Sequence, residues 1–245
     1  MKPCSKPNVS PLAPRLRRRL SLLAILCLGL TLRLYQLEQK SLWIDEAFSV
    51  WMARQPPDQM LEWLVRIDQH PPLYYTALHL WLGLDDGPFA ARALSAACST
   101  LTLPVLYCLG RRLFNQRVGL TAALILALSP FHVHLAQEAR MYAPLALNAA
   151  LALYALARLL TDPRATTAPL GRPLADFVRS WRAAGHMPPL RHIETDLAWL
   201  GYVIFTTATL LTHNTAIFFP LATNLLVLAV IPKSPVVHVQ PQTSK

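Results

Sequence analysis

The stretch Leu20–Leu37, LSLLAILCLGLTLRLYQL, decides the class of fold because it carries a single charge, Arg33, near its end. As a helix it extends about 27 Å, close to the roughly 30 Å hydrocarbon core of a bilayer. The basic cluster Arg15–Arg19 precedes it, which also fits a secretory signal, but no small-x-small cleavage site follows. We therefore expect an uncleaved membrane anchor.

The rest of the chain also has the composition of a membrane protein, with 53% hydrophobic and 15% charged residues. Residues 73–84 are apolar but too short to cross, so we expect a helix at the interface there. The sequence predicts an all-α polytopic bundle of about six transmembrane helices, with amphipathic juxtamembrane helices in the first outer loop. The further predicted spans are 89–109, 118–131, 142–160, 197–212 and 215–231.

The charges predict the orientation of the chain. Lys and Arg gather before residue 20, at 111–117 and at 164–191, whereas the loop 33–88 is rich in acids. Cytoplasmic loops are the basic ones, so the N-terminus should be cytoplasmic and the acidic loop outside. This pattern predicts a multi-pass protein of the plasma (inner) membrane. The formal net charge of +10 is then mostly a topology signal, and no recognition motif indicates nucleic acid as a partner.

The predicted organisation has five parts. They are a basic cytoplasmic tail at 1–19, a transmembrane module at 20–160 with its outer loop at 33–88, a basic cytoplasmic loop at 161–196, two further helices at 197–231 and a Pro-rich tail at 232–245. In the outer loop, Pro56-Pro57 breaks the chain, and Asp58 is expected to cap an amphipathic helix in which Glu62 and Arg66 pair.

Two adjacent carboxylates, Asp45 and Glu46, follow the first apolar stretch. An ionised carboxylate at a membrane surface suits deprotonation of an acceptor hydroxyl or amine, or retention of a cation beside a phosphate. The alternative is a solvated turn whose acids keep the loop outside. A divalent cation is therefore a possible cofactor, with Asp45 and Glu138 as possible ligands.

Further candidate residues lie at the predicted outer surface. Glu138 and Arg140 either pair with each other or bind ligand, since ionisable residues at this depth are functional candidates. Arg140 offers the planar donor fork that phosphate prefers. Arg92 either snorkels to the surface or contacts a phosphate. His70, before two prolines, is either a polar surface residue or a phosphate or metal ligand.

Five motifs in order resemble the N-terminal half of GT-C glycosyltransferases, in particular the protein O-mannosyltransferase and aminoarabinose transferase superfamily. The similarity extends over about 20–160. The motifs are Trp43-Ile-Asp-Glu-Ala-Phe-Ser, His70-Pro-Pro-Leu-Tyr-Tyr, Ala91-Arg-Ala-Leu-Ser, Gly110-Arg-Arg-Leu-Phe, and Ser129-Pro-Phe-His with Gln137-Glu-Ala-Arg-Met-Tyr-Ala.

The resemblance implies an inverting hexosyltransferase that takes a sugar from a polyprenyl-phosphate donor on the outer face of the membrane. The role of catalytic base carries onto Asp45, with Glu46 as helper or alternate. Glu138 and Arg140 map onto residues that flank donor and acceptor, the acceptor being a protein, lipid or polysaccharide. The residues expected to bind donor phosphate or substrate are His70, Tyr74, Arg92, Glu138 and Arg140.

The chain also departs from this family, whose members usually have more spans. We expect either a truncated product or a minimal homologue that needs a partner membrane subunit. The alternative function is a non-catalytic scaffold or lipid-binding subunit. The enzyme hypothesis requires Asp45, His70, Glu138 and Arg140 to converge on one outer cavity.

Overall fold

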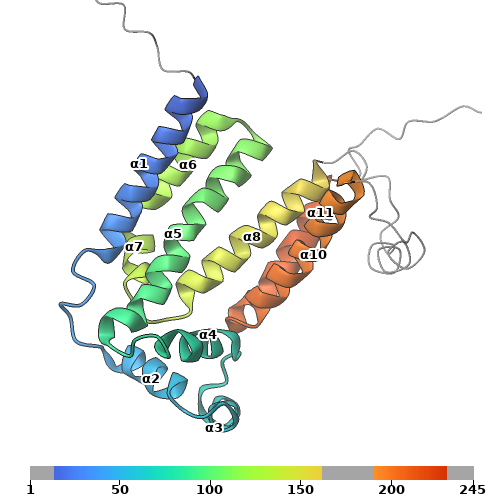
Figure 1. Cartoon of the computed structure of the whole chain (residues 1–245). Coiled ribbons are helices and arrows are strands. Elements are labelled where there is room, and N and C mark those ends of the chain that lie inside the picture. Colours follow the sequence, from blue (N-terminus) through green and yellow to red (C-terminus); the bar gives the residue numbers. More distant parts are fainter. Residues whose placement is uncertain (1–13, 162–189, 231–245) are drawn as a thin grey trace, which may run out of the picture.

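A computed structural model describes residues 14–161 and 190–230, and every regular element in these ranges is helical. Most of the predicted tails and of the 161–196 loop lies outside the described residues. The long helices stand side by side, and the short helices of the first loop lie at one end of them (Figure 1). The elements are α1 (Pro14–Leu34), α2 (Ile44–Ala53), α3 (Pro57–Trp63), the π-helix η1 (Leu64–Asp68), α4 (Leu73–Leu82), α5 (Pro88–Leu113), α6 (Gln116–Leu128), α7 (Pro130–Ala136), α8 (Tyr142–Leu160), α10 (Leu190–Leu210), the 3₁₀ helix η2 (Asn214–Ile217) and α11 (Phe218–Val230).

The number of spans differs from the expected six. Within the described ranges, α5 and α8 are long and apolar enough to cross a bilayer, and the pair α6–α7 makes a third if it counts as one bent span. Helix α1 carries Arg17–Arg19 near one end and Arg33 near the other, so its uncharged stretch is short. Helix α11 is apolar but spans only 13 residues. The all-helical membrane class is supported, whereas six spans are not confirmed.

The predicted helix over 118–131 is broken. The backbone bends by 62° between α6 and α7 at Ser129, because Pro130 cannot continue the hydrogen-bond ladder. The Ser129 side chain instead accepts from the His132 N–H and caps α7. The buried Arg33 donates to the carbonyl oxygens of Leu126 and Ala127 at 3.4 Å, at the end of α6 where the helical hydrogen-bond ladder stops.

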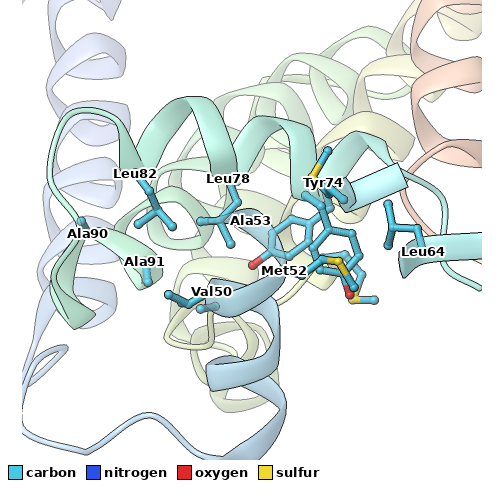
Figure 2. Close-up of a cluster of buried hydrophobic side chains, with 13 residues drawn as sticks. Val50, Met52, Ala53, Leu64, Tyr74, Leu78, Leu82, Ala90 and Ala91 are labelled. Carbon is cyan, nitrogen blue, oxygen red and sulfur yellow. The ribbon is translucent and has the colours of Figure 1, made fainter. Parts of the chain in front are cut away.

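The first loop folds against the end of the bundle as a helical layer. Figure 2 shows the core between α2 and α4, with Val50 and Met52 on one side and Leu78 on the other. The Glu62–Arg66 pair forms at 2.7 Å, as expected. Asp58 does not cap α3: the cap position is Pro56, with Pro57 at the first helical position and Asp58 in the first turn. Helix α4 lies across the ends of the long helices, consistent with an interfacial segment (Figure 1).

Candidate active site

The two neighbouring carboxylates at the start of α2 have opposite surroundings. Successive residues of a helix point about 100° apart, so Asp45 and Glu46 leave the axis in different directions. Glu46 is fully buried, whereas the side chain of Asp45 is 44% exposed. Only one of the two acids is therefore accessible to a substrate.

Glu46 forms a buried, bidentate ion pair with Arg92 of α5. The Arg92 Nε donates to Glu46 Oε1 at 2.9 Å, and Nη2 donates to Oε2 at 2.6 Å. The backbone N–H groups of Ala139 and Trp43 also donate to this carboxylate, at 2.8 and 3.3 Å. Burial raises the pKa of Glu46, but the bonds from Arg92 and Ala139 and the Arg92 charge outweigh burial, so the pKa lies below its ordinary value. Glu46 is thus held as a carboxylate.

Arg92 uses all of its N–H groups inside the protein. Besides its two bonds to Glu46, it donates to the carbonyl oxygens of Leu37, Lys40 and Ser41 at 2.8–3.1 Å. A guanidinium has five N–H donors, and these contacts account for five. Arg92 therefore joins α5, α2 and the loop after α1, and it has no donor left for a phosphate.

Asp45 faces Arg140, which lies between α7 and α8. The Nη2 of Arg140 is 3.8 Å from Asp45 Oδ2, and Nη1 donates to the Asp45 carbonyl at 3.4 Å. Both distances exceed the 2.7–2.9 Å typical of a charge-assisted hydrogen bond. The Nε of Arg140 is buried and has no hydrogen-bond partner among the described residues. Arg140 thus differs from Arg92 in keeping donor capacity for an anion.

His70 is linked to Arg140 through the rings of His213 and Tyr142. Its Nδ1 lies 2.9 Å from the Asp68 carbonyl oxygen and 3.1 Å from Asp68 Oδ1, both acceptors, so Nδ1 carries a proton. Tyr75 donates to the other Asp68 oxygen at 2.6 Å. Burial and this bond raise the pKa of Tyr75, which keeps its hydroxyl protonated as a donor. Asp68 and Tyr75 therefore fix the orientation of His70.

Tyr74 lies deeper, in the core between α2 and α4. It is 1% exposed, and its hydroxyl has no hydrogen-bond partner among residues 14–161 and 190–230. Burial raises the pKa of Tyr74 well above its ordinary value. The structure therefore places Tyr74 beneath the site rather than on its surface.

Glu138 lines a cavity of about 450 Å³ between the loop after α1 and the end of α7, which the Glu46–Arg92 pair also lines. Glu138 contacts His134 Nε2 at 3.2 Å, and Lys40 and Trp43 also line the cavity. Gln137 also lines this cavity, and its side chain donates to the carbonyl oxygens of Leu32 and Tyr35 at the end of α1. The expected cluster is therefore divided: Asp45 contacts Arg140, whereas Glu138 lines the cavity, which Asp45, His70 and Arg140 do not line.

The two possible metal ligands, Asp45 and Glu138, have different neighbours. Asp45 faces Arg140, whereas Glu138 lies in the cavity with His134. Within the described part of the chain, no three His, Cys, Asp or Glu side chains are grouped so that they could hold a metal ion.

Residues 69–170 match the family model for dolichyl-phosphate-mannose-protein mannosyltransferase. This segment is similar to that family, and we refer to it as the mannosyltransferase-like segment. No curated protein and no solved structure gave a match. The mannosyltransferase-like segment includes His70, Arg92 and Arg140. Asp45 and Glu46 precede it in sequence and contact it through Arg140, Arg92 and Ala139.

Three residues near His70 are not among the site residues predicted from the sequence: Asp68, Tyr75 and His213. Asp68 and Tyr75 flank the His70-Pro-Pro motif, and their spacing gave no sign that Asp68 would bind both Tyr75 and His70. His213 follows the segment, yet its ring lies 5.4 Å from that of His70 and 5.9 Å from that of Tyr142. The available signal was its position in a loop predicted to open on the same side of the membrane.

Proposed function

We propose that the chain is an integral membrane glycosyltransferase of the mannosyltransferase type, which transfers a sugar from a polyprenyl-phosphate donor to an acceptor on the outer face of the plasma membrane. The observation that supports this most directly is the Asp45–Arg140 contact. It sets an accessible carboxylate beside a guanidinium whose donors are not all used. The family match supports the reaction class, and the geometry suggests where the reaction takes place.

In the proposed reaction, Asp45 is the general base. It takes the proton of the acceptor hydroxyl while the acceptor oxygen attacks the anomeric carbon of the sugar. The bond between that carbon and the phosphate oxygen breaks, and the lipid phosphate leaves with the electron pair. Arg140 is placed to stabilise the negative charge that grows on the phosphate. Attack opposite the leaving group inverts the configuration of the sugar.

The other expected site residues receive different roles in this proposal. Glu46 and Arg92 are proposed to hold α2 in position, because their polar atoms are bonded to each other and to backbone. His70 is proposed to line the donor site, since Asp68 and Tyr75 orient it. Glu138 is proposed to act at a distance from the reacting atoms, in the cavity with His134.

A non-catalytic scaffold or lipid-binding subunit is the competing function. That hypothesis gives no reason for Asp45, Arg140 and His70 to gather on one side of the molecule. Their proximity therefore favours the enzyme, although Glu138 lies apart from them. A partner membrane subunit that completes the donor site is compatible with either function.

The test is transfer of labelled sugar in membranes that contain the chain, with a panel of polyprenyl-phosphate sugars, run with and without a chelator. Transfer from one donor above membranes lacking the chain is the expected result, and the chelator arm decides whether a divalent cation takes part. Absence of transfer from every donor, with the protein inserted and folded, would contradict the enzyme and favour the scaffold.

A further inference from the structure

His213 has a defined protonation pattern. The backbone N–H of Thr215 donates to His213 Nδ1 at 3.1 Å, and the Thr215 hydroxyl lies 2.9 Å from the same nitrogen. A backbone N–H can only donate, so Nδ1 must offer its lone pair. In the neutral ring the proton is then on Nε2. No described residue forms a hydrogen bond with Nε2, so within residues 14–161 and 190–230 this N–H is a donor without an acceptor.

The surroundings of His213 keep the ring neutral. Burial lowers the pKa of His213, and the neighbouring His70 and the positive charge of Arg140 lower it further. A neutral ring is consistent with the lone pair that accepts from Thr215. Near pH 7 His213 therefore provides a neutral N–H donor rather than a second cation.

His213 and Arg140 approach the same aromatic ring from different parts of the chain. The guanidinium carbon of Arg140 lies 5.9 Å from the centre of the Tyr142 ring, and the His213 ring is also 5.9 Å from it. His213 in turn contacts the His70 ring at 5.4 Å. A charged donor, Arg140, and a neutral donor, His213, therefore both lie against the Tyr142 ring.

Two hydrogen bonds hold the loop around His213, between α10 and η2, against the first outer loop. The Leu73 N–H donates to the Leu211 carbonyl at 3.1 Å, and the Asn214 side chain donates to the Gln69 carbonyl at 2.8 Å. Gln69 adopts a left-handed conformation with φ of 53°, which turns its carbonyl into this contact region. Both ends of the loop around His213 are thereby fixed relative to His70.

We propose that the Nε2–H of His213 is a second ligand of the donor's phosphate, beside Arg140, so that the loop between α10 and η2 completes the donor site. This inference rests on the proposed function, because it assumes that Arg140 binds that phosphate. It assigns a binding residue to a part of the chain outside the matched segment 69–170. The ligand class is a polyprenyl phosphate, recognised through its phosphate oxygens.

Binding of farnesyl phosphate to the detergent-solubilised full chain tests the proposal without any transfer step, with farnesol as the probe that lacks a phosphate. His213→Asn keeps a side-chain oxygen that accepts from Thr215, so it preserves the cap of η2 while it withdraws the Nε2–H. His213→Asp also keeps the cap and adds a negative charge. His213→Gln retains an N–H donor on a longer side chain.

The wild type is expected to prefer farnesyl phosphate to farnesol. His213→Asn should weaken farnesyl phosphate binding about tenfold, the usual effect of losing a hydrogen bond to a charged group, and His213→Asp should weaken it more. His213→Gln should recover part of the affinity, and farnesol binding should not change. Unfolding temperatures report whether each variant keeps its fold.

Three results would overturn the proposal: no preference of the wild type for the phosphate, wild-type affinity in His213→Asn and His213→Asp, or equal loss of farnesol binding. Wild-type affinity in both capped variants, with a loss only in His213→Ala, would show that His213 serves the η2 cap alone. Failure of sugar transfer with intact phosphate binding would count against the proposed function and not against His213.

Discussion

At the residue scale, two arginines of this chain illustrate what separates a structural cation from a ligand-binding one. Each of the five N–H donors of Arg92 bonds to an acceptor oxygen of the protein. Arg140, in contrast, has a buried Nε without a described partner, and its contacts to Asp45 are long. A phosphate can bind Arg140 without breaking a strong bond. Binding to Arg92 would first leave the buried Glu46 charge uncompensated, which is unfavourable by several kcal/mol.

The Glu46–Arg92 pair predicts a large loss of stability when it is broken from one side. Arg92→Ala leaves a buried carboxylate unpaired and should lower the free energy of unfolding by about 3–5 kcal/mol. Thermal unfolding of the purified protein in detergent measures this. The matched control is Arg54→Ala, because Arg54 pairs with Asp86 at 3.6 Å in solvent and such pairs contribute about 1 kcal/mol or less. Equal effects of the two substitutions would contradict the structural role of Arg92.

The same pair predicts a pH dependence of stability. The pKa of Glu46 is lower in the folded protein than its ordinary value of 4.5, so the folded state favours the ionised form. The stabilisation is complete above that ordinary value and is lost as pH falls through the lower, folded-state pKa. The difference in unfolding temperature between wild type and Glu46→Gln should therefore be largest at neutral pH and shrink in acid. A constant difference from pH 7 to pH 3 would show that ionisation of Glu46 does not stabilise the fold.

How far the sequence predicts the site also depends on individual residues. The sequence predicts that Asp45 and Glu46 lie just after an apolar stretch, and the structure agrees. It does not predict which of the two is buried, because that depends on the rotation of α2 against α5, set by contacts with Arg92 and Ala139 far along the chain. For the same reason, the sequence makes Arg92 and Arg140 equally good candidates for binding phosphate. Whether the N–H groups of an arginine already have acceptors in the protein depends on the tertiary structure.

At the scale of elements, helix packing depends on small residues where two backbones come close. Helices α5 and α6 meet at Gly110 and Gly119, where a Cβ on Gly110 would lie 2.9 Å from the Gly119 Cα. Glycine permits this approach because it has no side chain. The turn joining these helices also has a side-chain cap, since Asn115 accepts from the Val118 N–H at 3.0 Å.

Gly119→Ala is therefore predicted to destabilise the bundle. Its Cβ would lie 2.5 Å from the Tyr107 carbonyl oxygen and 2.9 Å from the Arg111 nitrogen, both backbone atoms that cannot move aside alone. We expect a loss of about 1–3 kcal/mol, measured by unfolding in detergent. Gly201→Ala is the control, because its Cβ would meet only the Ala155 Cβ at an ordinary 3.7 Å. If Gly119→Ala unfolds at the wild-type temperature, α5 and α6 do not pack this closely.

The sequence predicts a helix accurately where hydrophobicity alone determines its extent. It does so less well where a proline or a contact with another helix interrupts an apolar run. The predicted span 142–160 coincides with α8, Tyr142–Leu160, because the run is apolar apart from Asn148 and, near its end, Arg158. The run at 118–131 is equally apolar, but Ser129-Pro130 breaks it and Arg33 stabilises the break from another helix. The proline can be read from the sequence. The contact of Arg33 with the carbonyl oxygens at the end of α6 cannot, because Arg33 lies on another helix far along the chain.

At the scale of the whole molecule, the two ends of the long helices carry different residues. The polar cluster around Asp45 and the helices α2, α3 and α4 lie at one end, and the α5–α6 turn with Arg111 and Arg117 lies at the other (Figure 1). We propose that the first end faces outward and that the basic turn is cytoplasmic.

Cysteine labelling tests this orientation. In a background without Cys4, Cys27, Cys98 and Cys108, Asp85→Cys should react with a membrane-impermeant maleimide in intact cells. Arg117→Cys should react only after permeabilisation, because the basic turn is proposed to be cytoplasmic. Both original residues are exposed, so neither result reflects burial in the protein. The reverse pattern would place the Asp45 site on the cytoplasmic side and contradict the proposed location of the donor.

The most direct test of the central claim, that Asp45 is the general base of a sugar transfer, is the transfer rate of Asp45→Asn in membranes at equal protein insertion. Asparagine keeps the shape of the side chain but cannot take the proton, so the rate should fall about 10²–10⁴-fold. Asp58→Asn, an exposed acid of the same loop, should transfer at the wild-type rate. Wild-type transfer by Asp45→Asn, or an equal loss in Asp58→Asn, would contradict the account.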